Sequence, residues 1–282
     1  MSIMDELIDI LTLDPIEVNL FRGHSPPEER QRIFGGQVVA QALMAAYKTV
    51  GERTCHSLQS YFIRPGDPAI PVLYQVERSR DGHSFMTRRV IAIQKGEQIF
   101  NMACSFQRDE AGFDHQDAMP KVTPPDQLPD DVDRQSEELA SVPEDQKRWL
   151  RRRPIEMRQV DPVSQLKPVA KPAEHFVWLR ARESVGDDVA LNQALLAYAS
   201  DYSLLGSAMR PHGVSWMSAV QTASLDHIIW FHRPTDFSCW HLYAQDSPSA
   251  SGARGFNLGA IYREDGVLVA STAQEGLIRR RS

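Results

Sequence analysis

Asn192-Gln-Ala-Leu-Leu-Ala-Tyr-Ala-Ser-Asp201 is an almost uninterrupted apolar stretch that ends in one carboxylate. A helix that is apolar nearly all round is buried, so this stretch predicts a central helix and not a surface helix. A related stretch, Gln41-Ala-Leu-Met-Ala-Ala-Tyr47, lies in the first half of the chain. Two copies of one buried helix predict two copies of one fold, and the differences between the copies indicate where a site lies.

Each predicted helix is followed by segments with the composition of strands. In the first half, a short amphipathic helix (3–12), a strand (16–21) and the buried helix (34–47) precede strands at 56–64, 71–78, 84–94 and 98–107. In the second half, a strand (175–183) and the buried helix (189–205) precede strands at 221–232, 238–246, 253–263 and 267–278. Turn-forming residues separate the strands, which predicts an antiparallel sheet wrapped around each helix.

Short matching motifs support a tandem duplication. Phe62-Ile-Arg-Pro65 with Asp67 matches Phe231-His-Arg-Pro234 with Asp236, and a glycine precedes the last strand of each half, at Gly96 and Gly266. The spacing from helix to strand is longer in the second half, so the extra residues are predicted around 210–218. We therefore predict an N-terminal module (1–108), a Pro-rich acidic connector (109–153) and a C-terminal module (154–282).

The composition excludes several classes of protein. The chain has 282 residues, of which 42% are hydrophobic and 24% charged, as expected for a globular protein. A net charge of −6 does not favour nucleic-acid binding, and no apolar stretch is long enough to cross a membrane. The acidic N-terminus is unlike a secretory signal, and the three cysteines lack metal-ligand spacing. These features predict a cytoplasmic protein without a metal or cofactor.

The last strands of the two halves differ along one face, because alternate residues share a face. Large apolar side chains in the first half, at Phe100, Met102, Cys104 and Phe106, are replaced by Ala270, Thr272, Gln274 and Gly276. A glutamine on a face expected to be core breaks the local pattern, and such breaks tend to mark functional sites.

Two further exchanges add polar groups to the second half. Asp201 stands where the first half has Thr49, and Ser224 stands where it has Cys55. Each polar residue also has a structural explanation: the aspartate as a helix end, the serine as a strand hydroxyl, and Gln274 as an edge-strand amide. Because the three occur at matching repeat positions, we predict one active site in the second half, with the first half as a degenerate partner.

Other catalytic signatures are missing from the sequence. It contains no Gly-x-Ser-x-Gly nucleophile elbow and no glycine-rich phosphate-binding motif. His227 and His232 are five positions apart on a predicted strand and so face opposite sides, which favours structural roles over metal binding.

Several motifs closely resemble those of the type II acyl-CoA thioesterases, and together they cover most of the chain apart from the connector. They are Phe34-Gly-Gly-Gln-Val-Val-Ala-Gln-Ala-Leu43, Ser60-Tyr-Phe-Ile-Arg-Pro-Gly-Asp67, Tyr198-Ala-Ser-Asp201, Leu225-Asp-His-Ile-Ile-Trp-Phe-His-Arg-Pro234 and Ala270-Ser-Thr-Ala-Gln-Glu-Gly276. The resemblance implies an α+β double-hotdog fold, hydrolysis of fatty acyl-CoA to fatty acid and CoA, and a dimer or tetramer. It also implies catalytic roles for Asp201, Ser224 and Gln274, the residues that the comparison of the halves selects.

In the expected mechanism, Asp201 takes a proton from a water molecule that Ser224 and Gln274 hold against the thioester. Backbone N–H groups near the helix start at Gly36 are a candidate contact for the thioester oxygen. Two alternatives stay open. A hotdog enoyl-CoA hydratase or dehydratase would usually pair a histidine with an acidic residue on the helix, and no histidine lies within 193–201. A non-catalytic acyl-CoA-binding protein would not need the three polar residues.

Overall fold

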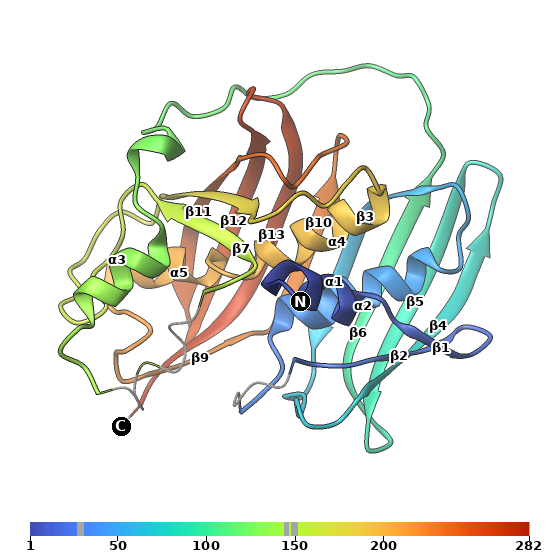
Figure 1. The fold of residues 1–282 in the computed structure, drawn as a ribbon, viewed down its shortest axis with the longest axis horizontal. Helices are drawn as coiled ribbons and strands as arrows, with labels where there is room; N and C mark the ends of the chain where they lie inside the picture. Colours follow the sequence, from blue (N-terminus) through green and yellow to red (C-terminus); the bar gives the residue numbers. More distant parts are fainter. Residues whose placement is uncertain (27–30, 144–146, 148–151, 282) are drawn as a thin grey trace.

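Two helices lie side by side at the centre of the protein (Figure 1). The computed structural model describes residues 1–26, 31–143, 147 and 152–281, and the central helices are α2 (Gly35–Tyr47) and α4 (Val189–Ser200). They run in opposite directions, because Gly36 at the start of α2 lies against the carbonyl of Tyr198 near the end of α4. At the other end, the Tyr47 hydroxyl donates to Gln193 Oε1 at 2.5 Å.

One antiparallel sheet wraps around both helices. The first half contributes β1 (Asp14–Glu17), β2 (Leu20–Gly23), β3 (Thr54–Phe62), β4 (Val72–Asp81), β5 (Phe85–Gln94) and β6 (Glu97–Gln107). The second half contributes β7 (Ile155–Gln159), β8 (His175–Ala181), β9 (Val220–Ser224), β10 (Asp226–Phe231), β11 (His241–Ser251), β12 (Arg254–Arg263) and β13 (Leu268–Arg280). The strand order is β1-β2-β4-β5-β6-β3-β10-β13-β12-β11-β8-β7, and β9 pairs with β13. The pairing of β3 with β10 joins the two halves into a continuous sheet.

Strand pairing confirms the predicted correspondence between the halves and, with it, the double-hotdog architecture. Phe62 pairs with Phe100 in the first half, as Phe231 pairs with Ala270 in the second. The same comparison holds at the other end of the strands, where Cys55 pairs with Phe106 and Ser224 pairs with Gly276. Each half therefore consists of a curled antiparallel sheet around its own central helix.

Three predicted elements are divided in the structure. The strand predicted at 221–232 forms two strands, β9 and β10, which pair with different parts of β13. The single strand predicted at 16–21 is wrong: β1 and β2 form a hairpin there, and Asn19 in its turn has a positive φ of 61°. The helix predicted at 189–205 ends at Ser200 instead, and Asp201 is its C-cap residue. A separate helix, α5 (Leu204–Met209), follows and leads into the 3-10 turn η3 (Arg210–His212), so part of the extra chain of the second half is helical.

Helix α5 accounts for part of the difference between the last strands. A Cβ atom at Gly276 would lie 2.4 Å from the Leu205 side chain, and one at Gly255 would lie 2.4 Å from Cβ of Ala208. The small residues of β12 and β13 therefore make room for α5. Gly276 on the altered face is thus explained by packing against α5.

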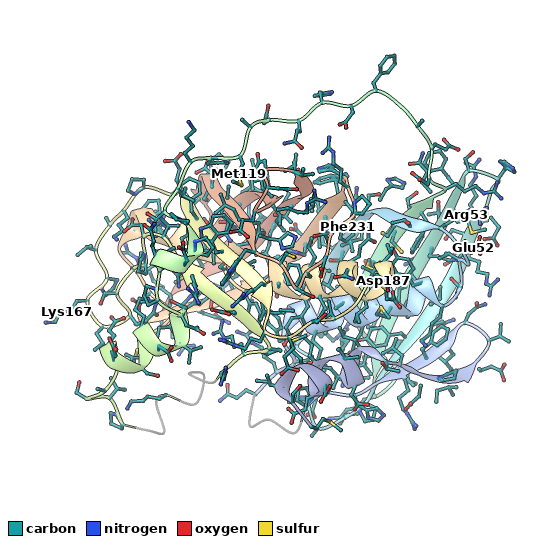
Figure 2. The ribbon with its side chains drawn as sticks, turned by 45° about the horizontal axis from the view of Figure 1, so that its top comes forward. Glu52, Arg53, Met119, Lys167, Asp187 and Phe231 are labelled. Atoms are coloured by element: carbon teal, nitrogen blue, oxygen red, sulfur yellow. The ribbon has the colours of Figure 1, made fainter. Side chains whose placement is uncertain are left out.

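The connector crosses the outside of the molecule and then packs against the second half. The segment that carries Met119 runs as an extended chain past the sheet (Figures 1 and 2). Beyond it come the 3-10 turn η1 (Pro125–Gln127) and helix α3 (Asp131–Glu138), which the sequence did not predict. Residues 144–146 and 148–151 lie outside the described residues, and the module boundaries stay a prediction.

The short helix predicted at 3–12 is confirmed as α1 (Ile3–Leu11), which buries Leu7 and Leu11 against the first half. Within the described part of the chain, no helix is long and apolar enough to span a bilayer.

Candidate active site

Asp201 lies where α4 ends and the start of α2 faces it. It is half-buried and has helical backbone angles (φ −86°, ψ −3°). A Cβ atom at Gly35 would lie 2.6 Å from Asp201 Oδ2, so the first residue of α2 is in close contact with this oxygen. The C-terminal end of a helix carries a partial negative charge, so it repels the Asp201 carboxylate. Here the positive end of α2, with its unpaired N–H groups, offsets that repulsion.

The other oxygen of Asp201 receives hydrogen bonds from the two predicted partners. The Ser224 hydroxyl donates to Oδ1 at 2.9 Å, and Gln274 Nε2 donates to the same atom at 2.7 Å. Ser224 ends β9, which pairs with β13, the strand that carries Gln274. The tertiary structure thus brings together three side chains from three separate elements, as the comparison of the two halves predicts.

Gln274 is fully buried, and its amide oxygen Oε1 has no hydrogen-bond partner among the described residues. A buried acceptor without a partner is unfavourable by about 1–3 kcal/mol. A water molecule held between Oε1 and the carboxylate would remove that penalty. The site therefore offers a fixed carboxylate and a buried acceptor at one place.

His227 is a member of this cluster that the sequence did not assign to the site. Its ring is fully buried, with Nδ1 3.0 Å from Gln274 Nε2 and Nε2 2.8 Å from Ser200 Oγ. Burial lowers the pKa of His227, and the nearby Asp201 opposes this shift. The sequence signal that was available is a polar residue at an inward-facing position of a central strand. In the described ranges, no group of three or more His, Cys, Asp or Glu side chains is arranged to hold a metal ion.

The equivalent place in the first half is filled by an arginine. The Arg88 side chain is fully buried; its Nε donates to Thr49 Oγ1 at 2.8 Å and its Nη2 donates to Asp81 Oδ1 at 2.5 Å. Burial raises the pKa of the Cys55 thiol, and raises that of Cys104 to about 12, so both stay protonated at neutral pH. The first half therefore has the Arg88 guanidinium bound to Thr49, the counterpart of Asp201. It has neutral thiols at the counterparts of Ser224 and Gln274.

Gly36 is buried against α4. A Cβ atom there would lie 2.3 Å from the Tyr198 carbonyl oxygen, so this glycine allows close packing of the two central helices. Its neighbour Gly35 is the glycine in contact with the Asp201 side chain, which the sequence did not identify. The role of Gly36 as a contact for the thioester stays a prediction.

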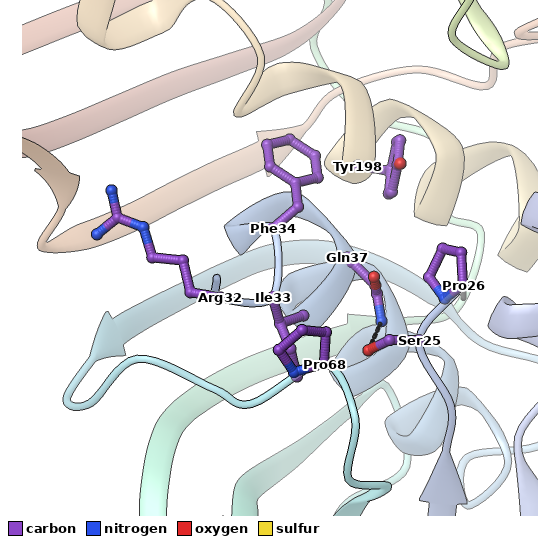
Figure 3. A pocket seen from close by; sticks show the side chains of 8 residues that line it. All are labelled: Ser25, Pro26, Arg32, Ile33, Phe34, Gln37, Pro68 and Tyr198. Atoms are coloured by element: carbon purple, nitrogen blue, oxygen red, sulfur yellow. Dashed lines mark hydrogen bonds between the residues drawn. The ribbon is translucent and has the colours of Figure 1, made fainter. Parts of the chain in front are cut away.

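A shallow pocket opens at the same end of α2, between the two halves (Figure 3). Tyr198 of α4 forms one side and Phe34, the residue before Gly35, forms another. Their rings contact edge to face at 5.1 Å between centroids, and the Phe34 ring also stacks on Tyr202 at 4.9 Å. The remaining lining residues are Ser25, Pro26, Arg32, Ile33, Gln37 and Pro68. A pocket with both polar and apolar side chains thus lies near the Asp201 cluster.

Comparison with known proteins identifies relatives over nearly the whole chain. Residues 153–277 match the family described as acyl-CoA thioesterase, and residues 24–107 match the acyl-CoA thioesterase N-terminal domain. The chain is 43% identical to the human acyl-coenzyme A thioesterase 8, over 96% of this chain and 88% of that protein.

Solved structures agree with this assignment. An acyl-CoA thioesterase II from Mycobacterium marinum is 44% identical, with a TM-score of 0.80 over 98% of this chain and 99% of that one. A hot dog fold protein of unknown function from Alicyclobacillus acidocaldarius is 20% identical, with a TM-score of 0.78 over 98% of this chain and 99% of that one, and supports the fold alone. Since the match extends through both halves, the chain belongs to the acyl-CoA thioesterase family.

Proposed function

We propose that this protein hydrolyses fatty acyl-CoA to a free fatty acid and CoA, with Asp201 as the general base. The observation that carries the proposal is the hydrogen bonding of one carboxylate oxygen by Ser224 and Gln274, which orients the carboxylate beside the start of α2. Family membership supports the same reaction, since the relatives are named acyl-CoA thioesterases.

In the proposed mechanism, a water oxygen attacks the thioester carbonyl carbon while Asp201 accepts one water proton. The second proton stays on the water oxygen and forms a hydrogen bond to Gln274 Oε1, which has no partner among the described residues. This arrangement fixes the direction of attack, and general-base catalysis of this kind contributes about 10²–10⁴-fold. The tetrahedral intermediate then expels the CoA sulfur, which takes the proton from Asp201. No covalent enzyme intermediate is needed.

The negative charge on the carbonyl oxygen needs nearby donors. The first N–H groups of α2, at Gly35 and Gly36, have no partners within the helix and lie at its positive end. We propose that they bind the oxyanion. The acyl chain then packs against the Phe34 and Tyr198 rings, which line the pocket between the halves.

Two rival functions are disfavoured by specific contacts. A hydratase that uses a histidine needs a ring nitrogen free to exchange a proton with the substrate, whereas both ring nitrogens of His227 have hydrogen-bond partners inside the protein. A non-catalytic acyl-CoA-binding protein gains nothing from burying the acceptor of Gln274, which lowers stability.

We also propose a cytoplasmic dimer or tetramer. Cys55, Cys104 and Cys239 are free thiols, as expected in a reducing compartment. The sheet has its edges at β1 and β7, and unpaired strand edges favour association with another chain.

The test is thiol release from acyl-CoAs of graded chain length, run beside a hydration assay with enoyl-CoA. We expect thiol release with a preference for part of the chain-length series. Hydration without thiol release would support the hydratase, and tight binding without either reaction would support the binding protein.

A further inference from the structure

The buried imidazole of His227 connects the site to the end of α4. Its Nε2 lies 2.8 Å from Ser200 Oγ, whose hydroxyl donates to the Ala197 carbonyl at 2.9 Å. Its Nδ1 lies 3.0 Å from Gln274 Nε2. His227 thus joins the helix that ends at Asp201 to the strand that carries Gln274.

The chemistry of these groups determines each proton position. The Asp201 carboxylate only accepts hydrogen bonds, so the Gln274 group at 2.7 Å from it must be the NH₂. That NH₂ also faces His227 Nδ1, which must therefore be an acceptor. The imidazole proton is consequently on Nε2 and is donated to Ser200 Oγ, since the Ser200 hydroxyl proton is already given to a carbonyl.

The orientation of the Gln274 amide depends on this chain of hydrogen bonds. With NH₂ held between Asp201 and His227, the amide oxygen is left as the buried acceptor without a partner in the described structure. A rotated amide would place its oxygen against the carboxylate oxygen, where two acceptors repel each other. A protonated imidazole would favour that rotated state, and burial opposes this protonation by lowering the pKa of His227.

The first half supports a functional link between the two residues. Its strands carry Leu58 opposite Cys104, both buried, where the second half has His227 and Gln274. The histidine and the glutamine thus occur in the half that has Asp201. The half that has Thr49 at that place has a leucine and a cysteine instead.

We propose that His227 is a positioning residue: by accepting from the Gln274 amide, it orients Oε1 toward the attacking water. The inference rests on the proposed function of the Asp201 cluster. In the expected cycle His227 touches neither substrate nor water, and it acts only through Gln274.

Two substitutions test whether His227 acts as a hydrogen-bond acceptor or only fills space in the core. Leucine has a similar volume and no acceptor, whereas asparagine has an amide oxygen close to the position of Nδ1. His227→Leu is expected to lower kcat about 10²-fold with KM nearly unchanged, because attack geometry is lost and binding is kept. His227→Asn is expected to restore most of kcat. Equal losses in the two variants would overturn the proposal.

A double-mutant cycle tests whether the effect passes through Gln274. In a Gln274→Ala background, His227→Leu should cause no further fall in kcat, whereas independent effects would multiply and contradict the proposal.

A measurement on the wild-type protein covers the case in which His227→Leu does not fold. Nitrogen-15 NMR of the labelled imidazole should report a neutral ring protonated on Nε2 at neutral pH, and a proton on Nδ1 would refute the assignment. Because this readout needs no turnover, it separates failure of the His227 proposal from failure of the proposed function, which the wild-type thiol-release assay decides.

Discussion

Gly35, at the start of α2, lies against Oδ2 of Asp201, at the end of α4, so closely that a Cβ atom would be 2.6 Å from that oxygen. The two residues come from different halves of the duplicated chain. The second half supplies the carboxylate, and the first half supplies the helix terminus that faces it. The candidate site therefore draws on both halves, although the two side chains that donate hydrogen bonds to Asp201, Ser224 and Gln274, belong to one.

Asp201→Asn should abolish the general base while keeping the size of the side chain. We expect turnover to fall by about 10²–10⁴-fold, because an amide does not accept the proton from water. Steady-state thiol release measures the loss, and the thermal unfolding midpoint should show that the fold is kept. Turnover within a few-fold of wild type would exclude Asp201 as the base.

Gln274→Ala and Cys104→Ala form a matched pair at equivalent positions of the last strands. Gln274→Ala should lower kcat by about 10²-fold, because the carboxylate loses a donor and the water loses an acceptor. Cys104→Ala removes a buried thiol that contacts neither, so turnover should stay near wild type. If both variants lost activity equally, the first half would not be a degenerate copy.

Gly35→Ala should impair turnover by forcing the Asp201 carboxylate or the Phe62 ring, 3.0 Å from the added Cβ, to move. A displaced base is expected to lower kcat by about 10²-fold with a modest change in stability. The control is Gly206→Ala in α5, where the added Cβ meets only Trp216 at 4.0 Å. Wild-type turnover in Gly35→Ala would argue against the close contact.

Gly36→Ala should act on stability instead. Its Cβ would meet the Tyr198 backbone carbonyl at 2.3 Å, and a backbone atom inside a packed helix pair moves far less easily than a side chain. Urea unfolding should show a loss of about 1–3 kcal/mol. An unchanged midpoint would contradict the close packing of Gly36 against the Tyr198 carbonyl.

Buried neutral histidines should make the fold sensitive to acid. Burial lowers the pKa of His175 to about 3 and that of His241 to about 4, whereas an unfolded histidine titrates near 6.5. Above pH ~6.5 both states are neutral and the two residues have no effect on stability. Below it the unfolded state binds more protons, so the free energy of unfolding falls as pH falls.

The expected slope is about 1.4 kcal/mol per pH unit for each of these histidines, between pH ~6 and ~4. Urea unfolding at a series of pH values measures it. His241→Gln removes one titrating group and should reduce the slope by about that amount, whereas an unchanged slope would mean that His241 is not neutral in the folded state.

The sequence alone determined the duplicated architecture and most residues of the candidate site. Apolar stretches and alternating strands depend on side chains a few residues apart, and they predicted the central helices, most strands and the correspondence between the halves. The same comparison selected Asp201, Ser224 and Gln274, because a polar residue at a core position stands out locally.

Only the tertiary structure decided the contacts between distant segments. It placed Gly35 and not Gly36 against the carboxylate, assigned His227 to the Gln274 amide, and filled the equivalent place in the first half with Arg88. The alternation of residues in the strands likewise did not predict that α5 packs against Gly255 and Gly276. A local pattern records whether a residue is buried, but which atoms meet there depends on how elements far apart in the chain pack together.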